Sequence, residues 1–198
     1  MAWDTERTRA LLIEAATTHF AQRGLAGTRV DAVARDAGVN KERIYQYFGN
    51  KEGLFDAVLT HSLECFLTAV PLEGEGASAI GEFAGCLHDE YADHPALPRL
   101  LAWEGLERGV LEADRDARAS ACRENAAMIQ AACPSLGAEE SAHLLLTVVS
   151  LATAYWTLPQ LADLMLGTRV EHDARRAVLV AQITAMASAL AERPEPLT

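Results

Sequence analysis

Runs of Val, Ile and Thr that alternate with polar residues, the usual mark of β-strands, are missing from this 198-residue sequence. Aromatic residues make up only 6% of it, whereas half of its residues are hydrophobic. The hydrophobic residues recur at spacings of three and four, which is typical of amphipathic helices. These features predict an all-α fold, long enough to bury a sizeable core as one domain or two small ones.

Long apolar runs are also lacking. The most apolar stretch, residues 144–156, is interrupted by Thr147, Ser150 and Thr153 and is shorter than the ~20 residues that a membrane-spanning helix requires. The first six residues do not show the charged and then apolar pattern of a secretion signal. We therefore expect a cytoplasmic protein without a membrane partner.

Cysteine is present but not in pairs. The four cysteines are Cys65, Cys86, Cys122 and Cys133. Because no C-x-x-C spacing occurs, neither a zinc knuckle nor a disulfide framework is expected. We expect reduced thiols in helices, with a redox-sensing role for one of them as the alternative.

Metal ligands at a suitable spacing occur at one place. Glu90 and His94 are four residues apart and His88 is near, so a metal can be imagined there. However, Pro95 follows directly and indicates that a helix ends with His94 near its C-terminal dipole. We expect neither a metal nor another cofactor.

Lysine is almost absent, and charge is unevenly distributed along the chain. Residues 1–60 carry eight Lys/Arg and eight Asp/Glu, whereas residues 61–198 carry nine and twenty, which accounts for the net charge of −11. The two lysines, Lys41 and Lys51, both lie in the first part. Phosphate would repel the acidic part, so the N-terminal part is the one that can face nucleic acid.

The N-terminal part begins with an amphipathic helix. Leu12, Ala16 and Phe20 recur at every fourth position within residues 5–23, and Gly24 follows. This spacing places the three apolar side chains on one face. The sequence therefore predicts a first helix that ends at Gly24.

Two short helices are predicted next. Thr28-Arg29-Val30-Asp31 resembles a capping box, in which the Thr28 hydroxyl can accept a hydrogen bond from a free N–H. After a glycine-containing turn, Asn40 caps a helix over residues 41–48 whose Ile44 and Phe48 point inward. Two short helices joined by such a turn and packed on a longer one form a helix-turn-helix.

Further helix patterns complete the chain. Asn50 caps a fourth helix that runs toward residue 70. Pro159 should kink or split a later helix, and Thr168-x-x-Glu171 is a capping box for the last one. About nine to ten helices are expected in total. The later patterns cover residues 78–93, 96–109, 114–133, 138–166 and 171–192.

The run from Gly24 to Phe55, GLAGTRVDAVARDAGVNKERIYQYFGNKEGLF, resembles the TetR family of bacterial regulators. The matching features are the Thr before the second helix, the turn at 37–39, the block at 44–48 and Asn50-Lys51-Glu52 at the start of the fourth helix. The resemblance implies a three-helix DNA-binding domain over residues 1–50. It also implies a larger helical domain over residues 51–198 for ligand binding and dimerisation.

The third helix is the one that enters the major groove in such a domain. Arg43 can donate to guanine, whereas Glu42 either accepts from a cytosine amine or repels phosphate. The family positions imply phosphate contacts from the tyrosines, which otherwise only pack the small domain. The expected DNA contacts are Thr28, Arg29, Asn40, Lys41, Glu42, Arg43, Tyr45, Tyr47 and Lys51.

The segments 138–157 and 171–192 are apolar over a wide arc, so they need cover on more than one side. The resemblance implies that they pair across a two-fold axis as a four-helix bundle. The alternative is that both lie inside a monomer core. The expected dimer-interface residues are Leu145, Val149, Val178, Ile183, Met186 and Leu190.

The resemblance further implies a ligand pocket among the later helices. Each candidate for its lining has a plainer alternative as core or as solvated surface. The candidates are Phe66, Phe83, Leu87, Glu90, Tyr91, Leu101, Trp103, Glu104, Arg123, Asn125, Met128, Tyr155 and Trp156.

The sequence thus predicts a repressor that binds a palindromic double-stranded DNA operator as a homodimer and is released by a small-molecule inducer. The alternative is a helical dimeric ligand-binding protein that has lost operator recognition, against which the cations of residues 41–51 argue. An enzyme is not expected, because no Gly-rich phosphate loop, G-x-S-x-G or H-E-x-x-H motif occurs.

Overall fold

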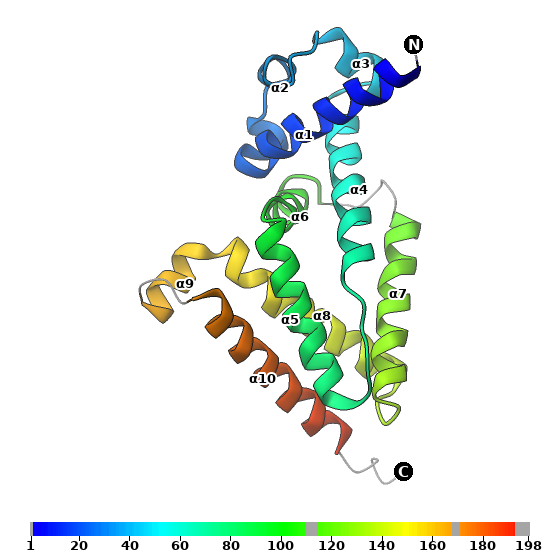
Figure 1. Cartoon of the computed structure of the whole chain (residues 1–198), viewed down its shortest axis with the longest axis vertical. Coiled ribbons are helices and arrows are strands. Elements are labelled where there is room, and N and C mark those ends of the chain that lie inside the picture. Colours follow the sequence, from blue (N-terminus) through cyan, green and yellow to red (C-terminus); the bar gives the residue numbers. More distant parts are fainter. Residues whose placement is uncertain (1, 110–114, 168–170, 193–198) are drawn as a thin grey trace. The chain divides into compact units, whose positions relative to one another are not determined.

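A computed structural model of the chain describes residues 2–109, 115–167 and 171–192, and within them it contains ten helices and no strand (Figure 1). The predicted fold class and number of helices are therefore confirmed. The helices are α1 (Ala2–Gly27), α2 (Val30–Asp36), α3 (Glu42–Phe48), α4 (Lys51–Ala69), α5 (Gly76–Asp93), α6 (Ala96–Glu107), α7 (Arg115–Ala132), α8 (Ala138–Thr157), α9 (Pro159–Leu166) and α10 (His172–Ala191).

The chain forms two compact units. Unit 1 comprises residues 1–67 and 94–114, and unit 2 comprises residues 68–93 and 115–198. Helix α6 thus belongs with α1 to α4, although α5 separates it from them in the sequence. These units do not coincide with the boundary at residue 50 drawn from the sequence, because α4 and α6 are packed with the helix-turn-helix.

The core of unit 1 is built on α1. Leu12, Ala16 and Phe20 are fully buried, as their spacing predicted. The Phe20 ring meets Phe55 of α4 edge to face, with ring centroids 5.1 Å apart. Ile44 adds the only large side chain that α3 buries completely. An aromatic contact therefore joins α1 to α4, and Ile44 anchors α3 in the buried core.

The end of α1 differs from the prediction. Gly24 adopts φ 68°, a left-handed conformation that favours glycine, and the helix continues for one more turn to Gly27. A Cβ at Gly24 would lie 2.7 Å from the Trp103 ring of α6. Gly24 therefore kinks the helix and admits α6, whereas the sequence predicted a stop.

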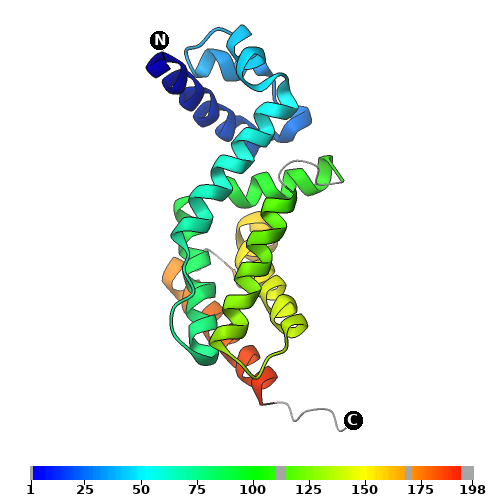
Figure 2. The ribbon, with the colours of Figure 1, turned by 90° about the vertical axis from the view of Figure 1, so that its right-hand side faces the viewer.

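Unit 2 is organised around the close packing of α5 and α10, which lie side by side in Figures 1 and 2. A Cβ at Gly81 of α5 would lie 2.0 Å from the Thr184 hydroxyl oxygen, and one at Gly85 would lie 2.8 Å from the Arg176 guanidinium carbon. The two glycines therefore allow the helix axes to approach. Helix α8 packs on α5 and α10, and α7 packs on α8.

Pro159 splits the predicted long helix, as expected, into α8 and α9, which meet at a bend of 89°. No single helix in the described ranges is long and apolar enough to cross a membrane, and this bent pair meets the criterion by length and composition alone. In α8, Leu144, Leu145 and Val148 are buried inside the unit. Thr168 of the expected last capping box lies outside the described residues.

Candidate functional site

Helix α3 presents a polar face on a buried anchor. Ile44 is completely buried, whereas Phe48 is half-buried beneath the Arg9 guanidinium, 5.5 Å from the ring centroid. The inward position predicted for Ile44 is confirmed, and that of Phe48 is confirmed in part. Because Ile44 fixes the inner side of α3, the residues on its other side are held toward solvent.

The outer face carries exposed polar and aromatic groups. Glu42 and Arg43 are exposed, and 46% of Tyr45 is accessible. The Arg43 guanidinium donates to Gln46 Oε1 at 2.9 Å and lies 6.0 Å from the Tyr47 ring centroid. An arginine held in this way is partly ordered before it meets a ligand, which lowers the entropy lost on binding.

Lys41 lies beside this face but has a partner. Its Nζ is 2.8 Å from Asp31 Oδ1 of α2 and 6.0 Å from the Tyr45 ring centroid. The hydrogen bond from Lys41 to Asp31 raises the pKa of the lysine ammonium. Lys41 is therefore fully charged, but Asp31 competes with any phosphate for it.

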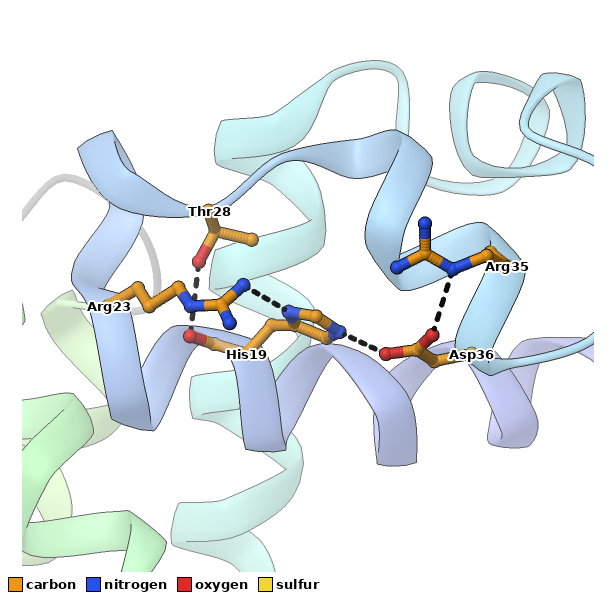
Figure 3. A network of polar contacts seen from close by, with 5 residues as sticks. All are labelled: His19, Arg23, Thr28, Arg35 and Asp36. Carbon is orange, nitrogen blue, oxygen red and sulfur yellow. Dashed lines mark hydrogen bonds and ion pairs between the residues drawn. The ribbon is translucent and has the colours of Figure 1, made fainter.

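A polar network fastens α2 to α1 (Figure 3). His19 Nε2 lies 2.7 Å from Asp36 Oδ2, and His19 Nδ1 lies 3.4 Å from the Arg23 guanidinium. Since arginine can only donate, Nδ1 accepts and the Nε2 proton is donated to Asp36. The hydrogen bond from His19 is the largest cause that lowers the pKa of Asp36. His19 and Asp36 were not predicted from the sequence because their partners lie 17 positions apart.

Thr28 contributes to this region differently from the prediction. Its side chain is buried, and its hydroxyl donates to the carbonyls of His19 at 3.1 Å and Gly24 at 2.7 Å. The expected hydroxyl cap of the second helix is wrong, since Arg29 is the N-cap and makes no side-chain capping bond. Thr28 is thus bound to the end of α1, and Lys51 Nζ donates to its carbonyl at 3.4 Å.

The other two predicted caps have different outcomes. Asn50 caps α4, since its Oδ1 accepts from the Gly53 N–H at 2.7 Å, as predicted. Asn40 is exposed and lies one residue before the N-cap of α3, which is Lys41. The Glu42 N–H approaches Asn40 Oδ1 at 3.5 Å, which is too long for a strong hydrogen bond.

Helix α6 clamps the end of α1 within unit 1. The Glu107 carboxylate accepts from the N–H groups of Leu25 at 2.6 Å and Ala26 at 3.2 Å, just after the kink. Arg99 Nε and Trp103 Nε1 both donate to the Ala21 carbonyl, at 2.8 and 3.3 Å. These contacts join residues about 80 positions apart, so no local sequence pattern could have indicated them.

A second contact joins α6 to α4. The Arg108 guanidinium, at the end of α6, forms an ion pair with Asp56 and lies 5.9 Å from the Phe55 ring centroid. The hydrogen bond to Asp56 raises the pKa of Arg108. Helix α6 is therefore held to both α1 and α4.

The predicted ligand residues are divided between the two units. Phe66, Leu101, Trp103 and Glu104 belong to unit 1, and the indole of Trp103 is bonded to α1. In unit 2, Arg123 and Met128 are exposed. Helices α5 and α8 are packed together and carry Phe83, Leu87, Glu90, Tyr91, Tyr155 and Trp156, of which the rings of Tyr155 and Trp156 are in contact.

Around His88 of α5, unit 2 contains an aromatic cluster. The centroid of the His88 ring lies 5.6 Å from that of Tyr155 and 5.5 Å from that of Trp156. The His88 ring also stacks on that of His172, with the centroids 4.7 Å apart. From the sequence, His88 was considered only as a metal ligand with Glu90 and His94. Among the described residues, no group of three or more His, Cys, Asp or Glu side chains is placed to hold a metal ion.

The predicted dimer residues fall into three sets by their exposure. Leu145 and Ile183 are buried in the core of unit 2, whereas 49% of Val178 and 39% of Met186 are accessible. Val149 and Leu190 are half-buried. A periodicity that places apolar residues all round a helix cannot tell which side faces the chain's own core.

Two family models match this chain. Residues 12–58 match bacterial regulatory proteins of the tetR family, and residues 79–192 match the tetracyclin repressor-like C-terminal domain. Among characterised relatives, the HTH-type transcriptional repressor SCO4008 of Streptomyces coelicolor is 41% identical over 116 residues, 59% of each chain. The repressor NicS of Pseudomonas putida is 34% identical over 113 residues, 55% of this chain and 53% of its own. The alignments thus span less than two thirds of these relatives.

Solved structures share the fold over most of the chain. The protein SCO4942 of Streptomyces coelicolor, assigned as a transcriptional regulator, is 28% identical with a TM-score of 0.76 and covers 90% of this chain and 97% of its own. A tetR-family regulatory protein from Rhodococcus RHA1 has a TM-score of 0.71 at 18% identity, with 91% of this chain and 96% of its own covered.

Proposed function

The chain belongs to the tetR family of bacterial regulatory proteins, and on that basis we propose that it represses transcription by binding a palindromic operator as a homodimer and leaves the DNA when a small molecule binds. The family resemblance predicted from residues 24–55 is confirmed. The relatives that match it are named as transcriptional repressors and regulators. A regulatory rather than a catalytic role is part of the proposal.

The observation that carries the proposal is the outer face of α3. Ile44 anchors the helix, and its sequence neighbours Arg43 and Tyr45 are exposed to solvent. A helix of this kind fits the major groove, where Arg43 can donate to guanine O6 and N7. In this proposal the hydroxyls of Tyr45 and Tyr47 contact DNA phosphates, as does the ammonium of Lys51 at the start of α4.

Charge supports this role for α3 despite the acidic composition. The first 60 residues are neutral in sum, and the excess negative charge lies in the remainder. Phosphate is attracted to local cations and repelled by the acidic part, so the N-terminal part meets DNA first. Glu42 remains the one carboxylate on the groove-facing turn, and its contact with a cytosine amine or repulsion of phosphate would shape the operator preference.

Exposed apolar side chains support the homodimer. Val178 and Met186 of α10 and Leu146 of α8 are exposed, although the helices that carry them form the core of unit 2 on their other sides. Covering such side chains with a second copy would remove apolar area from water. Two copies would place two α3 helices on successive half-sites, about 34 Å apart along the duplex.

Release by a small molecule requires only that the ligand binds one conformation better than another. A dimer in which the two α3 helices no longer match successive grooves would lose most of its affinity for the operator. The alternative, a dimeric ligand-binding protein without operator recognition, is disfavoured by the exposed Arg43 and Tyr45.

Fluorescence anisotropy with duplex fragments from the region beside its own gene tests the proposal. The intact chain should bind one fragment far more tightly than shuffled DNA, with an affinity that falls steeply with salt. Lys51→Ala should weaken binding to all sequences and reduce the salt slope by about 1, because one phosphate contact is lost.

Arg115→Ala serves as the matched control. It removes one exposed cation from α7, in unit 2, and should leave DNA affinity unchanged. Circular dichroism must show that the Lys51 variant keeps its helices, because its Nζ also bonds the Thr28 carbonyl. A DNA affinity that depends on neither salt concentration nor DNA sequence would instead favour the alternative, a ligand-binding protein without operator recognition.

A further inference from the structure

Within the described part of unit 2, three side chains have buried polar atoms without hydrogen-bond partners: His88, Trp156 and Ser141. Both ring nitrogens of His88 are buried and bonded to nothing in the described part of the chain, and the same holds for Nε1 of Trp156. His88 is completely inaccessible to solvent. Since buried polar atoms in native proteins almost always have partners, three unmet atoms in adjoining rings require an explanation.

The surroundings of these atoms are aromatic. His88 of α5 contacts Tyr155 and Trp156 of α8 and stacks on His172 of α10. The Tyr155 and Trp156 rings meet edge to face, 5.3 Å apart. Planar molecules pack well against such rings, because faces and edges of opposite partial charge can be matched.

The hydrogen-bonding capacity of the cluster follows from its protonation. Burial, followed by the charges of His172, Arg175 and Arg176 and opposed by Asp89, lowers the pKa of His88 to about 4. Neutral His88 has one N–H and one acceptor nitrogen, and the Trp156 indole has one N–H. The cluster thus offers two donors and one acceptor.

Among the charged groups next to the cluster, His172, Asp89 and Arg176 already have partners in the chain. His172 Nε2 lies 2.9 Å from Asp89 Oδ1, and Arg176 bonds both Asp89 at 2.7 Å and Glu82 at 3.1 Å. A charged ligand would lose its hydration at a completely buried ring without gaining an unoccupied counter-ion from these groups. A neutral ligand does not have this disadvantage.

We propose that His88 and Trp156 are the polar contacts of a small-molecule site in unit 2 that takes a neutral planar molecule with both a hydrogen-bond acceptor and a donor, such as an aromatic amide or a phenol. This rests on the proposed function, since it names the class of inducer that the repressor would sense. An acceptor oxygen of the ligand meets an N–H of the cluster, and its donor meets the acceptor nitrogen of His88.

Isothermal titration of the full chain with benzamide, phenol, benzoate and toluene tests the proposal. These probes have similar size but differ in charge and in hydrogen bonding. Benzamide or phenol should bind at least tenfold more tightly than toluene or benzoate. Equal binding of toluene would overturn the proposal, as would the absence of binding by both benzamide and phenol, which would leave a buried water as the partner of these atoms.

Substitutions at His88 test whether benzamide or phenol binds at this cluster. His88→Phe should weaken benzamide or phenol binding at least tenfold, whereas His88→Gln, which keeps a donor and an acceptor, should lose less. His61→Phe makes the same change at an exposed position of α4 in unit 1 and should leave binding unchanged. Binding by His88→Phe as tight as that of the unaltered chain, in a variant whose melting curve is cooperative, would refute the assignment.

The titration is independent of DNA, so the two proposals can fail separately. Specific DNA binding without any affinity for benzamide or phenol would refute only the small-molecule site at His88 and Trp156. Benzamide or phenol binding that depends on His88, in a chain that binds no DNA, would remove only the repressor function.

Discussion

The burial of His88 makes the stability of unit 2 dependent on pH. The side chain is surrounded by Tyr155 of α8, by His172, Arg175 and Arg176 of α10 and by Asp89 of its own helix, and its pKa lies near 4. In the unfolded chain the same side chain titrates at its ordinary value of 6.5. Between these two values the unfolded chain binds a proton that the folded chain does not.

The sign and the size of the effect follow from this difference. Stability is greatest above pH 6.5, falls as the pH falls toward 4, and loses nothing more below the folded value. The whole difference corresponds to about 3 kcal/mol of unfolding free energy. About 2 kcal/mol of it should be lost between pH 7 and pH 5.

Urea unfolding at pH 7 and pH 5 measures this loss. Replacing Trp3 and Trp103 by Phe leaves Trp156 as the fluorophore, which lies in unit 2 beside His88. In this background the free energy of unfolding is compared between chains with His88 and with His88→Phe. A packing change caused by Phe is the same at both pH values, so it cancels in the pH-dependent difference.

The expected result is that the chain with His88 loses about 2 kcal/mol more than the Phe variant between the two pH values. His88→Gln, which cannot be protonated, should behave as the Phe variant does. If all three chains lose the same free energy of unfolding between pH 7 and pH 5, His88 is not held neutral in the folded state. The two donors and one acceptor assigned to the proposed ligand site would then be refuted.

Three further predictions concern the contacts of α3, α6 and α5. Asp31→Asn should raise DNA affinity severalfold in anisotropy titrations at low salt, because it releases Lys41 from its ion pair. The control Asp116→Asn on α7 should leave the affinity unchanged. An unchanged affinity in the Asp31 variant would show that Lys41 does not contact phosphate. Glu107→Ala should lower the unfolding free energy of unit 1 by about 1–3 kcal/mol in denaturant titrations, because the N–H groups of Leu25 and Ala26 lose their acceptor. A loss near zero would contradict the role of Glu107 in holding α6 to the end of α1. In thermal melts, Gly81→Ala should destabilise unit 2 by about 1–3 kcal/mol, because the new Cβ would meet Thr184 and a backbone carbonyl. The control Gly105→Ala, which has open space around it, should stabilise α6 by up to about 1 kcal/mol. A gain in stability at both positions would refute the close packing of α5 on α10.

Much of the interface proposed for DNA could be predicted from the sequence. The spacing of Leu12, Ala16 and Phe20 defined the buried side of α1, and Asn50 marked the start of α4. Ile44 was predicted to point inward from its spacing of four with Phe48, and it is fully buried. These predictions succeeded because they depend on backbone preferences and on the helical repeat, which act within a few residues.

Predictions failed where a residue could take two structural roles. Thr28 stands where a capping hydroxyl is common, but the carbonyls of α1 take its proton, so no cap forms. Gly24 was expected to end α1, and it kinks it instead because Trp103 of α6 lies against the bend. At Gly24 the outcome depends on Trp103, which is distant in the sequence, whereas at Thr28 both the cap and the competing carbonyls were local and the sequence did not decide between them.

The sequence by itself determined that this chain is helical, where most of its helices begin and end, and that residues 24–55 form a helix-turn-helix. Each of these features depends on neighbours along the chain. Only the tertiary structure decided that α6 joins unit 1, that Leu145 and Ile183 lie inside rather than outside, and that His88 is enclosed by the rings of α8 and α10. Those features depend on contacts between residues that are tens of positions apart, and helix periodicity does not reveal which apolar side of a helix a distant helix will cover.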